Sequence, residues 1–116
     1  MTDRNGKEMK TGDYVIISGA FFKNDNATYI IEHSPGDENW TGRDYSLRKI
    51  KKDGSIVKNY NVAFWPLTVT VNDCRKYREA KAHNDANFRI FNVTYTAPDG
   101  GADITTEVKV ICREVA

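Results

Sequence analysis

The sequence predicts a β-dominated α+β domain, in which a small bent barrel of about five strands precedes one short helix and a C-terminal β-hairpin. Three observations support this prediction. The run 12–22 reads as a short strand that ends at a glycine and leads into aromatic residues and a polar turn. Asp53-Gly54 stands between two β-rich runs and is a strong hairpin signal, because both residues tolerate a positive φ. Beyond residue 72 the β-rich pattern gives way to a run that a capping residue can start as a helix.

Each element follows from its local pattern. The first five strands are expected where β-branched and aromatic residues are dense and turn formers separate them. Their ranges are 14–18, 28–33, 45–51, 56–64 and 68–71. The helix is expected from Asn72 or Asp73 to about 82, since either side chain can accept hydrogen bonds from the free N–H groups of a first turn. Two strands, 88–96 and 104–113, close the chain, and the last alternates apolar and polar residues as a half-buried strand does.

The 116 residues are expected to form a single domain. Residues 1–10 are expected to be a flexible N-terminal segment, 12–71 to form the barrel core, and 72–116 to add the helix and the two-strand extension. No apolar run approaches the roughly 20 residues that span a bilayer, and the first residues lack an apolar signal-peptide core. We therefore expect a cytoplasmic protein with no membrane partner.

The opening run is similar to a known family of small barrels. From Gly12 to Phe21 the chain begins Gly-Asp, alternates apolar residues and places Gly-Ala-Phe at the first turn. Over residues 12–28 this resembles KOW-type SH3-like barrels, which usually have proline where this chain has Ala20 and often a second glycine where it has Asn26. The resemblance implies an SH3-like barrel core. Proteins with this motif often contact ribosomes, RNA polymerase or nucleic acid, while many SH3-like barrels bind only protein.

A second likeness lies over residues 33–67. Its features are His33-Ser34-Pro35-Gly36-Asp37, Trp40, Gly42, Tyr45 with Leu47, Lys52 with Gly54, and Phe64-Trp65-Pro66-Leu67. This pattern is similar to a small domain of accessory proteins from bacterial conjugative or phage-like elements. The resemblance implies a bacterial or mobile-element accessory protein and offers no catalytic chemistry to carry over.

Positive charge is concentrated locally, although the formal net charge of +1 argues against bulk attraction to nucleic acid or anionic membranes. The basic side chains lie in a hairpin over 43–58 and in the expected helix over 75–81. They are Arg48, Lys49, Lys51, Lys52 and Lys58 in the hairpin, and Arg75 and Arg78 in the helix. They could follow a phosphate backbone, with Tyr45 or Tyr60 as a stacking platform. The alternative is a solvated hairpin whose lysines discourage edge-to-edge pairing of strands.

Three aromatic residues are candidates for contacts with a protein partner. Trp40 lies in a polar loop and is either folded back onto the barrel or exposed, where it would be a binding hot spot. Phe21 and Phe22 are adjacent in a turn and cannot both face one core, so we expect one of them at the surface.

The sequence shows no convincing catalytic or metal-binding constellation. His33 with Asp37 and Glu38 is the grouping that most suggests acid–base chemistry, but these carboxylates lie in a Gly- and Pro-containing loop, where they are ordinarily solvated. Cys74 and Cys112 are too few and too far apart for a zinc site. We therefore expect no catalytic residue, no metal and no cofactor.

Together these observations predict a non-enzymatic binding module, an accessory protein of a bacterium or mobile element that engages a protein or nucleoprotein partner. The near-neutral charge favours a protein partner. The alternative is a nucleic-acid-binding protein that uses the hairpin 43–58 and the helix 75–81. The candidate binding residues are Phe21, Phe22, Trp40, Arg48, Lys49, Lys51, Lys52, Lys58, Arg75 and Arg78.

Overall fold

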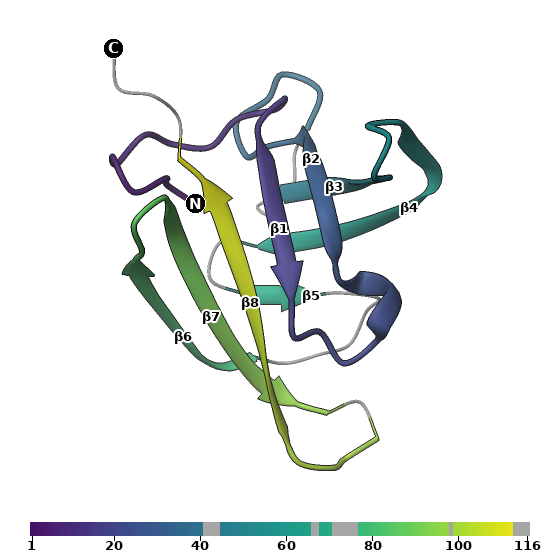
Figure 1. Cartoon of the computed structure of the whole chain (residues 1–116), viewed down its shortest axis with the longest axis vertical. Helices are drawn as coiled ribbons and strands as arrows, with labels where there is room; N and C mark the ends of the chain where they lie inside the picture. The colour runs from purple at the N-terminus through teal and green to yellow at the C-terminus, as the bar shows by residue number, and fades with distance from the viewer. Residues whose placement is uncertain (41–44, 66–67, 71–76, 98, 113–116) are drawn as a thin grey trace.

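One strongly curved antiparallel sheet forms most of the molecule (Figure 1). The computed structural model describes residues 1–40, 45–65, 68–70, 77–97 and 99–112. The strands are Tyr14–Ser18 (β1), Ala27–His33 (β2), Tyr45–Ile50 (β3), Ile56–Trp65 (β4), Thr68–Thr70 (β5), Tyr77–Asn84 (β6), Phe88–Thr96 (β7) and Asp103–Ile111 (β8). Within the described residues, the helical structure is one turn of 3-10 helix, Lys23–Asp25 (η1), before β2. None of the described segments forms a helix long and apolar enough to cross a bilayer.

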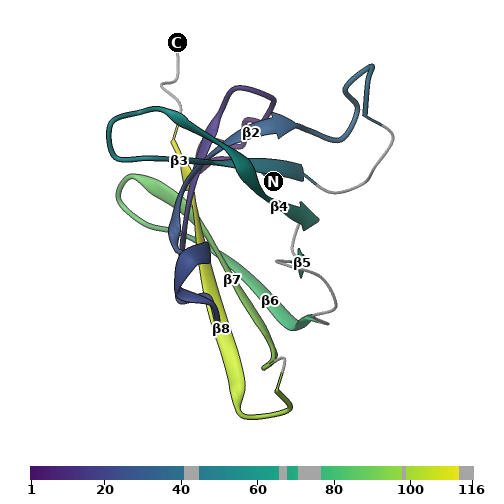
Figure 2. The ribbon, with the colours of Figure 1, turned by 90° about the vertical axis from the view of Figure 1, so that its right-hand side faces the viewer.

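The sheet is a meander in which the first strand also pairs with the last, in the order β5-β4-β3-β2-β1-β8-β7-β6. Every pairing is antiparallel. The curvature brings β5 close to β6 (Figure 2), but no ladder joins these two strands in the described part of the chain. The sheet is therefore open at this point.

The prediction of a helix up to residue 82 is wrong. Residues 77–84 form strand β6, which pairs with β7 so that Ala80 lies opposite Val93, while residues 72–76 lie outside the described part. The reason is the buried strand β7. It pairs with β8 along one edge, and without β6 the backbone N–H and C=O groups along its other edge would be unpaired. That ladder outweighs a helix propensity supported only by a weak apolar stripe.

The prediction of an SH3-like barrel of about five strands, followed by the helix and the C-terminal hairpin, is also wrong, because all the described strands belong to one open sheet. Strand β8 pairs directly with β1, placing Val110 opposite Val15 and Val108 opposite Ile17. All four side chains are buried, so the hairpin β7–β8 completes the same core that β1 and β2 line. The backbone N–H and C=O groups of β1, a strand with buried Val15 and Ile17, need partners on both edges, and the chain supplies the second one from its C-terminal region.

The core fills the concave side of the sheet. Its largest fully buried side chains are Tyr29, Tyr45, Tyr95, Met9, Ile17, Ile31, Leu47, Val15 and Val93. The segment 1–10, expected to be flexible, packs against this core through Met1 and Met9 and is tied by an isolated bridge between Thr2 and Glu8.

Two turns explain local features of the sequence. The hairpin at Asp53-Gly54 is confirmed: Gly54 has φ of 89° and its N–H donates to the carbonyl of Lys51 at 2.9 Å. At the end of β1, Gly19 has φ of 73°, and a Cβ there would lie 2.8 Å from the carbonyl oxygen of Thr105. Asn26, where the KOW motif often has glycine, has φ of −79°, and its side-chain oxygen accepts from the N–H of Ala20 at 2.9 Å.

Candidate binding site

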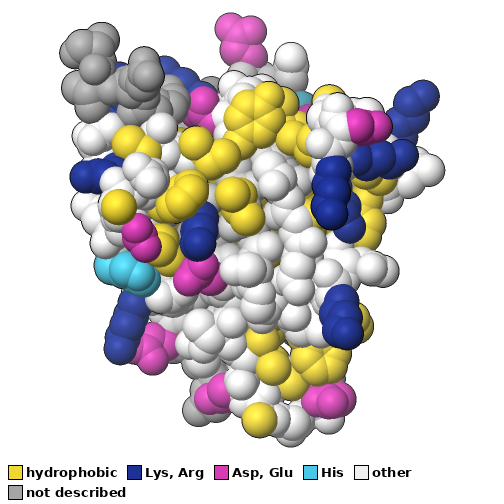
Figure 3. Space-filling view, viewed as in Figure 1, with side chains coloured by type: hydrophobic (Ala, Val, Ile, Leu, Met, Phe, Trp, Pro, Cys, Tyr) yellow, Lys and Arg dark blue, Asp and Glu magenta, His cyan; other side chains and the backbone are white. Residues whose placement is uncertain are grey.

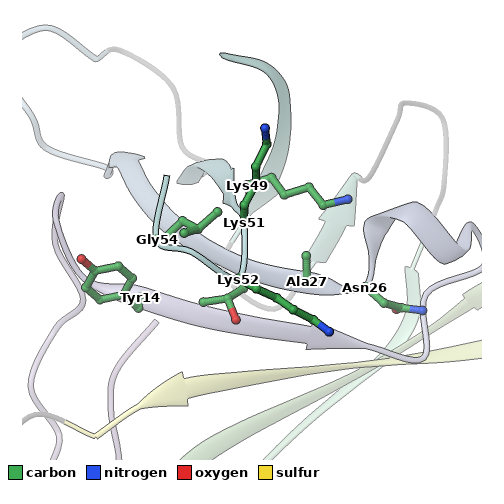
Figure 4. Close-up of a pocket in the computed structure, with 9 residues that line it drawn as sticks. Tyr14, Asn26, Ala27, Lys49, Lys51, Lys52 and Gly54 are labelled. Carbon is green, nitrogen blue, oxygen red and sulfur yellow. The ribbon is translucent and has the colours of Figure 1, made fainter. Parts of the chain in front are cut away.

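A groove of about 690 Å³ lies on the side of the sheet that faces away from the core, between β1–β2 and the turn that joins β3 to β4 (Figure 4). It is lined by Tyr14, Asn26, Ala27, Thr28, Lys49, Ile50, Lys51, Lys52 and Gly54. Figure 4 places Tyr14 at one end of the groove and Asn26 at the other, with the three lysines between them. We call this surface the lysine groove.

Strand register forms the floor of the lysine groove. Core-facing residues alternate with outward ones, so buried Tyr29 is flanked by outward Thr28 and Ile30. Thr28 lies opposite Ile50, and Ile50 lies opposite Ile56. Tyr14 lies opposite Ile30 in the neighbouring row. Because directly opposed residues share a face, these side chains form one apolar surface.

This outward face exposes apolar side chains to an unusual degree. Tyr14 is 44% exposed and Ile56 is 50% exposed. Figure 3 shows hydrophobic side chains gathered over the upper part of β1 and β8, and lysine or arginine side chains gathered over the β3–β4 turn. An exposed apolar patch with a charged border is typical of an interaction surface.

The three lysines of the groove differ in how they are held. The Lys49 amino group donates to the carbonyl oxygen of Asn24 at 2.6 Å and lies 4.4 Å from the centre of the Tyr60 ring, so it is fixed in place. Lys51 and Lys52 are exposed. The nearby Asp53 carboxylate accepts from Ser55, from its hydroxyl at 2.6 Å and its N–H at 2.9 Å, and these bonds, helped by Lys51, lower the pKa of Asp53. No carboxylate is among the described residues that line the groove.

A buried network supports the lysine groove from the core side. Asp25 is fully buried, and its carboxylate accepts a hydrogen bond from the hydroxyl of Tyr60. Its backbone carbonyl accepts from the hydroxyl of Tyr29 at 2.7 Å. Burial, together with nearby Tyr60 and Asp25, raises the pKa of Tyr29 well above its ordinary value. This network fixes η1, the turn to which Lys49 is bonded, and the sequence analysis did not identify Asp25.

Arg48 is engaged within the protein. Its guanidinium forms a two-pronged ion pair with Glu32, which includes a bond of 3.0 Å from Nη2 to Oε1, and it also donates to the carbonyl of Lys58. The pair raises the pKa of Arg48 and lowers that of Glu32. Both residues border a second cavity of about 300 Å³, whose apolar lining includes Ile30 and Ile56. The charges of Arg48 and Glu32 beside this cavity therefore compensate each other.

Trp40 is folded back and half-buried. Its indole stacks on the imidazole of His33, with ring centres 4.8 Å apart and planes 3° from parallel. The Asp37 carboxylate accepts from the N–H and hydroxyl of Ser34 at 3.1 and 3.2 Å and from the hydroxyl of Thr11, which together lower its pKa. The grouping considered for acid–base chemistry is thus engaged in fixing the 34–40 loop.

The two adjacent phenylalanines divide as expected. Their rings make an edge-to-face contact with centres 5.0 Å apart. Phe21 is half-buried and its N–H donates to the hydroxyl of Tyr95 at 3.4 Å, whereas Phe22 is 42% exposed. Phe22 directly precedes η1, so it lies in the turn that leads to Asn26 at the end of the lysine groove.

The structure brings together only part of the predicted site. Lys49, Lys51 and Lys52 share the lysine groove, and Lys58 is exposed on β4. The other candidates do not join them. Trp40 lies beyond the opposite end of β2, Arg75 lies outside the described residues, and Arg78 is in β6, with its side chain outside them. Figure 1 shows β6 and the β3–β4 turn on opposite sides of the molecule.

The apolar partners of these lysines are not among the binding candidates that the sequence predicts. Tyr14, Ile50 and Ile56 were assigned only to strands. A signal was present, because β1 reads Tyr-Val-Ile-Ile and is apolar on both faces, which in a small sheet implies that the outer face is also covered. Tyr45, a possible stacking platform, is buried in the core, and Tyr60 is bonded to Asp25.

No metal site is evident in the described part of the chain, where no group of three or more His, Cys, Asp or Glu residues could hold an ion. The side chain of Asn5 donates to the sulfur of half-buried Cys112 at 3.0 Å, and Cys74 lies outside the described residues.

Comparison with protein-family models, curated proteins and solved structures finds no match to this chain. Function must therefore be argued from the geometry of the surface.

Proposed function

We propose that this protein is a non-enzymatic binding module that engages an acidic surface of a protein or nucleoprotein partner through the lysine groove. One observation carries the proposal: two exposed lysines, Lys51 and Lys52, border a groove with an apolar floor and no lining carboxylate among the described residues. Lysines beside a groove with no lining carboxylate favour an anionic ligand.

A binding role fits the chemistry of the groove better than catalysis does. Its titratable groups are three lysines and Tyr14, and general acid–base catalysis ordinarily pairs groups of complementary function. His33, the residue most suited to proton transfer, is stacked on Trp40 at the other end of β2.

A protein partner is favoured over nucleic acid alone. The two tyrosines considered as stacking platforms are buried or bonded internally, and the described part of the expected basic helix, residues 77–82, is strand β6. Lys81, which lies within the segment expected to be helical, forms an ion pair with Glu79 at 3.0 Å. The basic surface is thus one short groove rather than a track that could follow several phosphates.

The biological setting rests on resemblance. The likeness of residues 33–67 to accessory proteins of conjugative or phage-like elements supports a bacterial or mobile-element protein acting in the cytoplasm. The KOW-like run 12–28 supports a partner that is part of a nucleoprotein.

The test is a fluorescence-anisotropy titration with labelled polyglutamate, oligo-dT and a DNA duplex, at low and at physiological salt. We compare the wild type with Lys51→Glu/Lys52→Glu, and with Arg4→Glu/Lys10→Glu, a matched double reversal of exposed residues outside the groove. The proposal predicts salt-dependent binding of polyglutamate, lost in the groove variant and reduced less in the control. Failure to bind any polyanion at low salt overturns it, and binding of nucleic acid alone supports the alternative.

A further inference from the structure

We propose that the ligand of the lysine groove is a short acidic peptide segment of a partner protein, anchored by an apolar side chain on the β1–β3 floor. This inference rests on the proposed function and specifies its ligand. It requires a surface with two chemically different parts, a cationic border and an apolar floor, placed side by side.

The cationic border is formed by Lys51 and Lys52. Both are exposed at the end of the β3–β4 hairpin, and the short turn at Asp53-Gly54 holds their backbone in place through the bond from Lys51 N–H to the carbonyl of Ser55 at 2.9 Å. Lys49 is held inward by Asn24 and the Tyr60 ring. The two outer lysines are therefore the ones available to carboxylates of a ligand.

The apolar floor continues from the lysine groove towards the second cavity. Ile50 lies opposite both Thr28 and Ile56, and Ile56 also lines the second cavity. Ile30 stands two residues beyond Thr28 on β2, so it faces the same side, about 7 Å along the strand. A ligand that places carboxylates at the lysines can therefore lay apolar side chains along the isoleucines.

The composition of this floor favours peptide over single-stranded nucleic acid. Its side chains are mostly aliphatic, and Tyr14 is the one aromatic residue among those that line either cavity. Bases bind by stacking on aromatic rings, whereas aliphatic side chains of a ligand pack well against exposed isoleucine. At about 690 Å³ the groove is within the range of ligand pockets, which suits a short segment rather than a folded domain.

The charge pattern also orients the segment. No carboxylate is among the described residues that line the lysine groove, whereas Arg48 and Glu32 neutralise each other beside the second cavity. We therefore expect acidic residues at one end of the bound segment and apolar residues at the other.

The test is selection of a random-peptide display library against the folded full chain, with depletion on Lys51→Glu/Lys52→Glu. Selected peptides are then labelled and titrated by anisotropy. The inference predicts enrichment of segments with acidic residues beside an aliphatic or aromatic one. Replacement of that anchor by alanine is expected to weaken binding about tenfold. Ile56→Ser and Tyr14→Ser, both changes at half-exposed positions, are each expected to weaken it several-fold, whereas Arg4→Glu/Lys10→Glu has a smaller effect.

The outcomes separate this inference from the proposed function. Acidic peptides that bind equally well with and without the apolar anchor overturn the inference and leave a purely electrostatic binding module. Tighter binding of oligo-dT than of any selected peptide also overturns it, in favour of nucleic acid. If neither peptides nor polyanions bind the wild type, both the inference and the proposed function fail.

Discussion

The two ends of strand β2 carry similar kinds of side chains but use them differently. At the His33 end, which we call the tryptophan end, Trp40 stacks on His33 and Arg48 pairs with Glu32. At the Ala27 end, the lysine groove gathers three cations, and none of its described lining residues is a carboxylate. Both ends contained residues that the sequence marked as binding candidates. The difference teaches that a charged or aromatic residue indicates a binding surface only where the fold does not provide its partner.

Spacing along the chain accounts for this difference. The loop after His33 is long enough to turn back, and Asp37 fastens it to Ser34 and to Thr11 in the preceding turn. The β3–β4 turn is tight, so its lysines project from a short hairpin with only Asp53 nearby, and that carboxylate is already bonded to Ser55. A long loop can satisfy its own polar groups, whereas a short hairpin turn exposes its side chains.

The largest effect is expected from removing the support beneath the lysine groove. Asp25→Ala removes the buried carboxylate that accepts from the hydroxyl of half-buried Tyr60, and is expected to lower the free energy of unfolding by about 2 kcal/mol. Urea unfolding followed by tryptophan fluorescence measures the change. Asn24→Ala, an exposed position in the same turn, is the control and is expected to change stability little. Equal stability of the two variants would show that the network does not support the turn.

The tryptophan end is expected to weaken in acid. The pKa values of Asp37 and Glu32 are both lowered by their hydrogen-bond partners. A lowered pKa means that the stabilisation is complete above the ordinary values, 3.8 for Asp37 and 4.5 for Glu32, and is lost as the pH falls through the lowered ones. Urea midpoints measured from pH 7 down to pH 3 should therefore fall at the acid end for the wild type. Asp37→Asn should flatten that fall in part, since Glu32 and Asp53 still contribute; an unchanged profile would contradict the assigned role of Asp37.

Much of the fold could be predicted from local signals. The strand predicted at 14–18 is found at those residues. Asp53-Gly54, a strong turn signal, forms the predicted hairpin and exposes the lysines beside the turn. Strand β6 could not be predicted this way. Its residues include Glu79, Ala80, Lys81 and Ala82, which suit a helix, and they form a strand because β7 needs a partner. That requirement depends on tertiary structure and leaves little trace in the segment itself.

The lysines of the candidate site could be predicted from the sequence, but the apolar floor of the lysine groove could not. Lys49, Lys51 and Lys52 stand close together in sequence, so any hairpin there gathers them. The floor depends on register across four strands, which places Tyr14 beside Ile30 and Thr28 beside Ile50. Register is a long-range property set by how the whole sheet buries one face. Asp25 was missed for the same reason, since its partner Tyr60 is 35 residues away in sequence.

Phe22 and Trp40 offer a direct comparison of the two ends of β2. Phe22 is 42% exposed beside the lysine groove, so Phe22→Ala is expected to weaken binding of a selected acidic peptide about threefold through lost apolar contact. Trp40→Ala is expected to change that affinity by less than about twofold, because the indole already packs on His33. Anisotropy titrations of both variants measure the difference. A larger loss for Trp40→Ala would place the binding surface at the tryptophan end instead.

The smallest effect is expected from removing the carboxylate partner of Arg48, the cation at the tryptophan end. Glu32→Gln removes the carboxylate that pairs with Arg48, leaves a side chain of the same shape, and gives the second cavity an uncompensated guanidinium. Binding of polyglutamate at low salt should tighten about twofold, because this cavity adjoins the lysine groove and the new charge lies within a Debye length of it. Glu79→Gln is the matched control, since it breaks the ion pair with Lys81 on remote β6 and changes the net charge equally. Equal tightening in both variants would mean that overall charge governs the affinity. Tightening in Glu32→Gln alone would mean that internal pairing is what keeps the tryptophan end from binding.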